Sequence, residues 1–277
     1  MKKLLLSLLA AVILFTGCAA TQTTQAGVVG VQRRQFMLLS EKQVESMSAE
    51  SYLATLQEAD KNKTLNTDAQ QLQRVRTIAN RLIVPTVTFR PDAASWKWEI
   101  NVQDSEEVNA YCMPGGKIMV FKGLISKLKA TDDELAAVMG HEIAHALREH
   151  GRERMSEAYV QQIGMFGLAA LVGATAKDEQ KAAATMEIAS LVTTIGLTLP
   201  HSREQEREAD RMGLELAARA GYDPQAAVSL WRKMTAAGGA KQPEFLSTHP
   251  SGESRISDLQ GLIPTVLPLY EEAKRRP

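Results

Sequence analysis

The pentapeptide His-Glu-Ile-Ala-His at positions 141–145 constrains the fold of this 277-residue chain more than any other feature. It lies in a stretch of helical periodicity, where four residues turn by about 400°, so the two histidines lie about 40° apart on one face. Both imidazoles can therefore reach one tetrahedral zinc ion at about 2.0–2.1 Å. Glu142 stands beside them and can act as a general base. The pattern predicts a helix that carries His141 and His145 as two metal ligands.

The start and the end of this helix also have sequence signals. Thr131 and Glu134 have the spacing of a capping box, and Gly151 can end the helix after His150. In one continuous helix, His150 would lie about 900° after His141, on the opposite face. We therefore interpret His150 as a structural residue favoured by the helix dipole, and not as the third ligand.

A catalytic zinc needs a third protein ligand and one open position. Glu206 and Asp210 lie four residues apart, on one face of a predicted helix. One carboxylate can bind the metal, and the other can accept the distal N–H of a ligand histidine. Glu204 and Glu208 each lie about 200° from Glu206, so we expect no role for Glu204 and a solvated Glu208. A charge-rich helix is more often simply a solvated face, and the upstream motif is what favours Glu206 as the third ligand.

The remaining periodicity predicts an α+β fold that is mainly helical. The segments with a helical pattern are residues 40–60, 68–84, 155–175, 182–199 and 202–220. The predicted strands are residues 96–102, 108–112 and 117–121. Pro114-Gly115-Gly116 is a turn signal between the last two strands, so we expect a small antiparallel β-sheet beside the helix that carries the motif.

The N-terminal residues have the features of an exported lipoprotein. Two lysines precede an apolar stretch that is too short for a comfortable membrane span, and residues 14–18 resemble a bacterial lipobox apart from Phe15. We predict a signal peptide at 1–17, lipidation of Cys18, a lipid-anchored flexible tether at 18–39 and one domain at 40–277. Ala19 resembles the outer-membrane sorting signal of Gram-negative bacteria. The expected location is therefore the periplasm, on the outer membrane.

An ordinary cleaved signal followed by a coincidental cysteine is the alternative. Cys18 would then be able to form a disulfide with Cys112, and otherwise Cys112 is either buried or a reactive thiol. Lys+Arg and Asp+Glu both number 32, so the formal net charge is zero. No long basic run is present, and we expect no nucleic-acid partner.

The motifs together resemble the zinc metallopeptidases grouped with HtpX and the CAAX prenyl proteases. In that family an H-E-x-x-H helix is followed by a helix with E-x-x-x-D. The residues that match these positions one by one are His141, Glu142, His145, Glu206 and Asp210. Residues 108–118 resemble the Asn-Ala and Pro-Gly-Gly strand region of the family. The resemblance implies a zincin-like peptidase domain and one Zn²⁺ per chain.

The resemblance also implies a function. Since the chain lacks the multiple membrane spans of HtpX, it is similar to the secreted or lipoprotein members, which are implicated in envelope protein quality control. The implied reaction is hydrolysis of peptide bonds in misfolded or misassembled envelope proteins, with Glu142 as the general base. His249 is a candidate that contacts the oxyanion or occupies the open zinc position in a resting state. A loop histidine that caps the next helix is an equal alternative. Arg255 is a weaker candidate, and a structural ion pair is the favoured reading for it.

An extended substrate can add to the strand edge of Asn109, Ala110 and Tyr111, unless this edge is internal to the sheet. The expected partners are unfolded polypeptides, the membrane through the lipid anchor, and outer-membrane assembly proteins. The alternative function is a latent peptidase that acts mainly as a chaperone-like binding module. An intact Glu142 favours the peptidase, because a binding module has no need of it. A purely structural zinc site fits poorly, because such sites use closed, cysteine-rich coordination.

Overall fold

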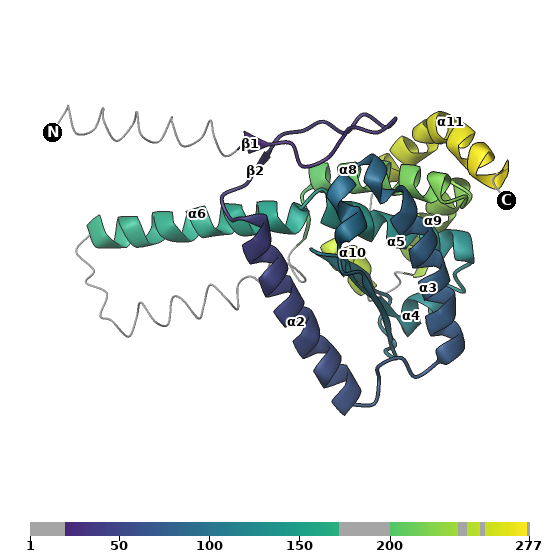
Figure 1. Cartoon of the computed structure of the whole chain (residues 1–277), viewed down its shortest axis with the longest axis horizontal. Coiled ribbons are helices and arrows are strands. Elements are labelled where there is room, and N and C mark those ends of the chain that lie inside the picture. Colours follow the sequence, from purple (N-terminus) through teal and green to yellow (C-terminus); the bar gives the residue numbers. More distant parts are fainter. Residues whose placement is uncertain (1–19, 172–199, 238–242, 250–252, 276–277) are drawn as a thin grey trace.

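The computed structural model describes residues 20–171, 200–237, 243–249 and 253–275 (Figure 1). Its α-helices are α2 (Glu41–Lys61), α3 (Ala69–Ile83), α4 (Lys122–Lys127), α5 (Asp132–Leu147), α6 (His150–Leu171), α8 (Arg203–Arg219), α9 (Gln225–Ala237), α10 (Glu244–Thr248) and α11 (Glu253–Arg275). Its strands are β1 (Ala20–Thr21), β2 (Gln35–Phe36), β3 (Glu99–Gln103), β4 (Ala110–Met113) and β5 (Lys117–Phe121), and two 3₁₀ helices are η1 (Val84–Thr88) and η2 (Pro91–Ser95). The prediction of a mainly helical α+β fold is confirmed.

The helix starts follow the capping signals of the sequence. Ser40, Thr131 and Ser202 each accept a hydrogen bond from the backbone N–H of the third helical residue, whose side chain returns the contact. Asp68 caps α3 with its carboxylate, which accepts hydrogen bonds from the backbone N–H groups of Gln70 and Gln71. As a result, α2, α3, α5 and α8 begin within about one residue of the predicted positions. The helix predicted at 182–199 lies outside the described residues.

The three-stranded sheet has the order β3-β5-β4. β4 and β5 form the predicted antiparallel hairpin, in which Gly115 and Gly116 have φ of +79° and +80°. β3 pairs with the other edge of β5 in parallel, with Ile100 opposite Ile118. The expectation of a wholly antiparallel sheet is therefore wrong for one of its two pairs. An alternating pattern indicates which side chains share a face, but it carries no information on strand direction.

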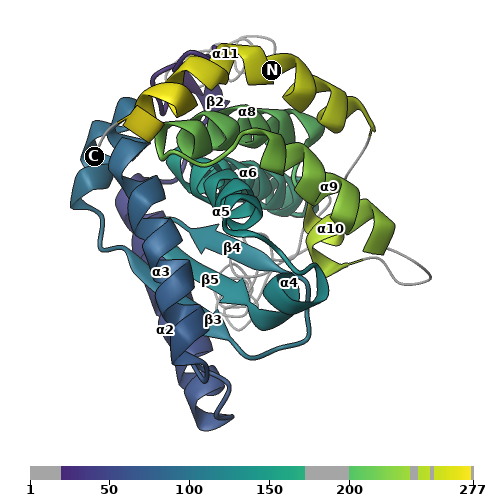
Figure 2. The ribbon, with the colours of Figure 1, turned by 90° about the vertical axis from the view of Figure 1, so that its right-hand side faces the viewer.

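The alternation of β5 gives the sheet two covered faces. Ile118 and Val120 join the main core, which includes side chains of α3 and α5. Met119 and Phe121 point to the opposite face and pack with Tyr52 of α2. Figure 2 shows the strands side by side, with α5 above them and with α2 and α3 alongside. The sheet is thus held between helices, and β4 lies at its edge next to α5.

Helices α5 and α8 cross in close contact at two glycines. A Cβ atom on Gly213 of α8 would lie 2.7 Å from the backbone nitrogen of His141 on α5. A Cβ atom on Gly140 would lie 2.9 Å from the carbonyl oxygen of Gly213. The absence of side chains at both positions lets the two backbones approach, so that the residues beside this crossing can face one another.

The segment before α2 packs onto the rest of the protein. β1 and β2 pair with each other, and Val29 and Val31 are buried in the main core. Gln35 is fully buried and donates a hydrogen bond to the carbonyl oxygen of Arg148. The prediction of a flexible tether is therefore wrong for residues 20–39, because their apolar and polar side chains both have partners in the domain. Residues 1–17 and the lipidation candidate Cys18 lie outside the described residues.

Among the described residues, no helix combines the length and the apolar character needed to cross a membrane.

Candidate metal centre

Four of the predicted site residues meet at the crossing of α5 and α8. His141 and His145 come from α5, Glu206 comes from the first turns of α8, and His249 follows α10. One ligand atom from each of these four residues lies within 4.8 Å of the others. All four side chains are buried, with Glu206 only 1% exposed. The two distant helices therefore converge as the sequence predicts.

The spacing of these atoms fits a bound metal ion. Two ligands that each lie 2.0–2.1 Å from one tetrahedral zinc ion are about 3.3 Å from each other. Here the Nε2 atoms of His141 and His145 are 3.0 Å apart, and Nε2 of His145 is 3.4 Å from Oε1 of Glu206. Nδ1 of His249 is 3.2 Å from Nε2 of His141. Imidazole nitrogens and one carboxylate at these distances form a donor set suited to zinc.

Asp210 and Arg255 support two of these donors from the side away from the cluster. Oδ1 of Asp210 lies 3.0 Å from Nδ1 of His141. Arg255 donates to both oxygens of Asp210, and its Nη1 lies 2.6 Å from Oε2 of Glu206. The guanidinium also lies 4.0 Å from the ring centre of Trp231. The ion pair predicted for Arg255 is thus present, and Asp210 lies where the sequence predicts a partner for a ligand histidine.

His150 lies against the cluster instead of on the opposite face. α5 ends at Leu147, and Glu149 has a φ of +55°, which breaks the helix and turns the chain into α6. As a consequence Nδ1 of His150 lies 2.8 Å from Nδ1 of His145. The prediction that it faces away from the site is wrong, because it assumed one continuous helix to residue 150. Its interpretation as a structural residue and not a third ligand stays a prediction.

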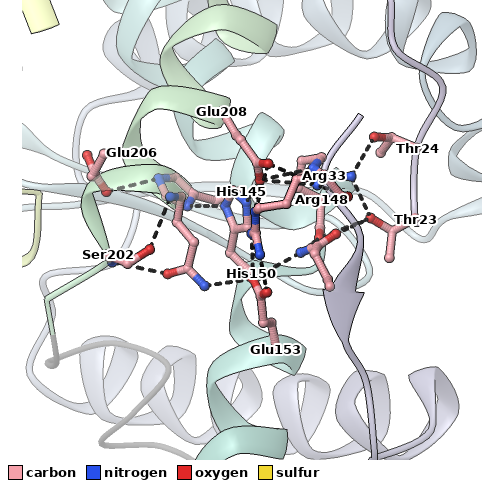
Figure 3. A network of polar contacts seen from close by, with 12 residues as sticks. Thr23, Thr24, Arg33, His145, Arg148, His150, Glu153, Ser202, Glu206 and Glu208 are labelled. Atoms are coloured by element: carbon pink, nitrogen blue, oxygen red, sulfur yellow. Dashed lines mark hydrogen bonds and ion pairs between the residues drawn. The ribbon is translucent and has the colours of Figure 1, made fainter. Parts of the chain in front are cut away.

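Glu208 is buried, and the expectation that it is solvated is wrong. Its carboxylate accepts hydrogen bonds from His150, Arg33 and Arg148. Burial by itself would raise the pKa of Glu208, but the hydrogen bonds from His150 and Arg33 and the charge of Arg148 lower it to about 2. The charge is therefore kept inside the protein by cations that come from distant parts of the chain (Figure 3).

Glu142 lies close to the cluster, but its carboxylate is not hydrogen-bonded to His249 as that of Glu206 is. Its Oε1 is 3.5 Å from Nε2 of His249 and is buried with no hydrogen-bond partner among the described residues. Burial raises the pKa of Glu142, although the nearby His249 and His141 oppose this effect. A buried carboxylate oxygen with a spare lone pair and a raised pKa is suited to accept a proton.

His249 and His201 complete the wall around these donors. The ring of His249 stacks on Phe245 with centroids 4.3 Å apart, and its Nδ1 lies 2.9 Å from Glu206 Oε1. Although burial opposes it, the charges of Glu142 and Glu206 raise the pKa of His249. His201 was not singled out by the sequence analysis. Its ring lies 4.0 Å from that of His145, and burial lowers its pKa well below the usual value, which keeps it neutral.

A cavity of about 500 Å³ opens onto this cluster. Its walls include Glu142, His145 and His249 on one side and the β4 residues around Tyr111 on another. β4 pairs only with β5 within the described sheet, so Asn109, Ala110 and Tyr111 lie at a sheet edge that borders the cavity. Cys112 also borders it but is buried, and burial raises the pKa of its thiol well above the usual value, so it is not an activated thiol.

Comparison with known proteins identifies a peptidase family that covers the part of the chain with this cluster. The model of peptidase family M48 matches residues 69–263, which include the two crossing helices and the donors described above. The chain belongs to peptidase family M48. The M48 family match confirms the family-level resemblance, which the sequence motifs had placed near HtpX and the CAAX prenyl proteases.

Several curated relatives are metalloendopeptidases or proteases by name. The mitochondrial metalloendopeptidase OMA1 of Bos taurus is 33% identical over 276 residues, which cover 97% of this chain and 51% of that protein. OMA1 of Schizosaccharomyces pombe is 36% identical over 170 residues, or 61% of this chain and 47% of that protein. The beta-barrel assembly-enhancing protease of Escherichia coli K12 is 30% identical over 176 residues, or 61% of this chain and 35% of that protein. This chain spans about half, or less, of the length of these relatives.

Proposed function

We propose that this protein is a zinc-dependent endopeptidase in which His141, His145 and Glu206 bind one Zn²⁺ and Glu142 is the general base. The observation that carries the proposal is the convergence of the three ligand side chains, from two helices, beside the cavity that Glu142 and His145 border. The donor distances are those expected between zinc ligands, and membership of family M48 supports a metallopeptidase.

A zinc ion bound here would supply Lewis-acid chemistry, because it polarises a scissile carbonyl and makes water nucleophilic at neutral pH. Glu142 takes up the proton released by the attacking water and returns it to the leaving amine. Its raised pKa suits both transfers, since a more basic carboxylate holds the proton between the two steps. Asp210 and Arg255 keep His141 and Glu206 oriented while the proton moves.

His249 has two roles in this proposal. With Nδ1 at 3.2 Å from His141 Nε2 and 2.9 Å from Glu206 Oε1, it stands where a fourth ligand would complete the tetrahedron. In such a resting arrangement it would hold the position that a catalytic zinc site keeps open. When it moves aside for the substrate, it would remain close enough to donate to the oxyanion.

The substrate is an unfolded polypeptide that binds in extended form along β4. Backbone groups of Asn109, Ala110 and Tyr111 at the sheet edge would pair with the substrate backbone. Such pairing uses little side-chain information and therefore suits misfolded or misassembled proteins of varied sequence. The cavity between β4 and the metal cluster gives room for a side chain of the bound segment.

The lipobox-like sequence at Cys18 supports a location for this activity at the periplasmic side of the outer membrane, in quality control of envelope proteins. The name of the E. coli relative, a beta-barrel assembly-enhancing protease, supports outer-membrane assembly proteins as partners. A second function, a latent peptidase that mainly binds unfolded envelope proteins, is favoured by one observation. His249 stands at the fourth donor position, and a protein in which it never left would bind polypeptides without cleaving them.

Cleavage of unfolded casein by the purified protein tests the proposal. We expect one bound zinc per chain, turnover that is lost with a chelator and restored by zinc, and a Glu142→Gln variant that binds zinc but does not cleave. Glu204→Gln, a change of the same kind at an exposed residue of α8, should cleave normally. Casein binding without cleavage in the zinc-loaded protein would favour the latent function, and a protein that binds no zinc would refute both the site and the reaction.

A further inference from the structure

A chain of buried side chains leads away from the metal cluster through His145. Nδ1 of His145 lies 2.8 Å from Nδ1 of His150, and Nε2 of His150 lies 2.9 Å from Oε2 of Glu208. His150 is fully buried, and both of its ring nitrogens have these contacts (Figure 3). An imidazole is thus inserted between a ligand histidine and a carboxylate.

The positions of the hydrogens on His145 and His150 follow from the proposed metal site. Nε2 of His145 faces the other donors, so its lone pair is directed to the metal and the hydrogen is on Nδ1. Nδ1 of His150 must then accept this hydrogen, which places the hydrogen of His150 on Nε2. That group donates to the ionised carboxylate of Glu208. Each buried nitrogen has one role in this arrangement, and no donor faces another donor.

The series of side-chain contacts continues from Glu208 to the N-terminal segment at residues 20–36. Arg33 donates from Nε to Oε1 of Glu208 at 2.9 Å and also pairs with Glu153. Arg148, which is fully buried, contacts Glu208 and also donates to the Thr23 and Thr24 hydroxyls and to the carbonyl oxygen of Arg33. The carboxylate that holds His150 is therefore itself held by a segment more than 100 residues away in the sequence.

Building on the proposed function, we propose that His150 is a positioning residue that fixes the ring of His145 through its Nδ1 acceptor, and that the N-terminal segment supports it through Arg33 and Glu208. Outer partners of this kind orient a ligand ring and set its hydrogen, and their loss typically lowers metal affinity by roughly 10- to 100-fold. Release of the N-terminal segment therefore weakens zinc binding although none of its described residues contacts the cluster.

Zinc affinity of the full chain, measured by competition with a chromophoric chelator, tests the role of His150. We expect His150→Ala to lower the affinity roughly 10- to 100-fold. We expect His150→Asn to retain most of it, because the amide oxygen lies near the position of Nδ1 and can accept from His145. Long-range ¹H–¹⁵N spectra of the wild-type zinc protein should show the hydrogen of His150 on Nε2. Unchanged affinity in His150→Ala, or a hydrogen on Nδ1 of His150, would overturn the assignment.

Two neighbouring arginines give a matched test of the N-terminal segment. Arg33→Gln removes the contact with Glu208, whereas Arg34→Gln removes only an exposed contact with the carbonyl oxygen of Ala20. We expect weaker zinc binding in Arg33→Gln alone, with thermal unfolding used to compare the folded fractions. Equal affinities of the two variants would refute the contribution of the segment. A wild-type protein without zinc would instead refute the proposed function, so the two failures are distinguishable.

Discussion

Replacing Gly213 by alanine should force apart the two helices that carry the metal site. The new Cβ would lie 2.7 Å from the backbone nitrogen of His141 and 2.9 Å from the carbonyl carbon of Gly140. Ordinary contact begins at about 3.4 Å, so α5 and α8 must separate by about 0.7 Å. The obstructing atoms are backbone atoms of α5, and no side chain can rotate away to relieve the contact.

The expected effect on stability combines two terms of opposite sign. Overpacking of a tight contact destabilises by about 1–3 kcal/mol, while alanine in place of glycine inside a helix stabilises by about 0.5–1 kcal/mol. We expect a net loss of about 1–2 kcal/mol in the free energy of unfolding. A metal site tolerates displacements of about 0.5 Å, so a 0.7 Å separation of His141 from Glu206 should also weaken zinc binding.

Urea unfolding and zinc competition, both on the full chain, measure these effects. Gly261→Ala is the matched control, because a Cβ on this exposed glycine of α11 meets no atom within 4 Å. It should leave zinc binding unchanged and stabilise the protein slightly. If Gly213→Ala unfolds and binds zinc as the wild type does, the close helix crossing does not set the geometry of the site.

Three further predictions follow from charges in and near the site. Glu206→Gln should strongly reduce zinc occupancy, measured by elemental analysis, whereas Glu204→Gln should not; full occupancy in Glu206→Gln would remove it from the ligand set. Arg255→Leu leaves two buried carboxylates without their cation and should lower the unfolding free energy of the apo protein by about 3–5 kcal/mol. Arg211→Leu, which breaks a partly exposed pair with Asp258, should change it by less than about 1 kcal/mol; equal losses would contradict this reasoning. The folded-state pKa of Glu208 is depressed from 4.5 to about 2. The ionised carboxylate therefore contributes on the order of 3 kcal/mol to the free energy of unfolding above pH 4.5, and this contribution is lost as the pH falls towards 2. The stability difference between wild type and Glu208→Gln should shrink over that range, and a constant difference would show that Glu208 titrates normally.

The sequence predicts the parts of the site that depend on local geometry. The spacing of His141 and His145, the capping box at Thr131, and the hairpin at 114–116 each depend on a few neighbouring residues, and the structure contains all of them. The pairing of the Glu206 helix with that of His141 was inferred from the need of a catalytic zinc for a third ligand, and the resemblance to a family then made this long-range contact specific.

The errors arise where distant segments decide the outcome. Glu208 is in a charge-rich run that looks solvated, and it is buried because Arg33 and Arg148 reach it from elsewhere in the chain. The direction of β3 depends on the path of the chain around β5, which no periodicity encodes. The packing of residues 20–39 was missed because a composition rich in threonine, glutamine and glycine resembles a linker, although Val29 and Val31 are buried in the main core.

Because the backbone at Glu149 is left-handed, the contact between His145 and His150 requires a fixed number of residues between them. Four residues separate His145 from His150, and the helix break among them returns the second ring to the first. One added residue would rotate the start of α6 and carry His150 away, whereas surface loops elsewhere tolerate such additions. In this part of the chain, the number of residues between the two rings therefore matters as much as which residues they are.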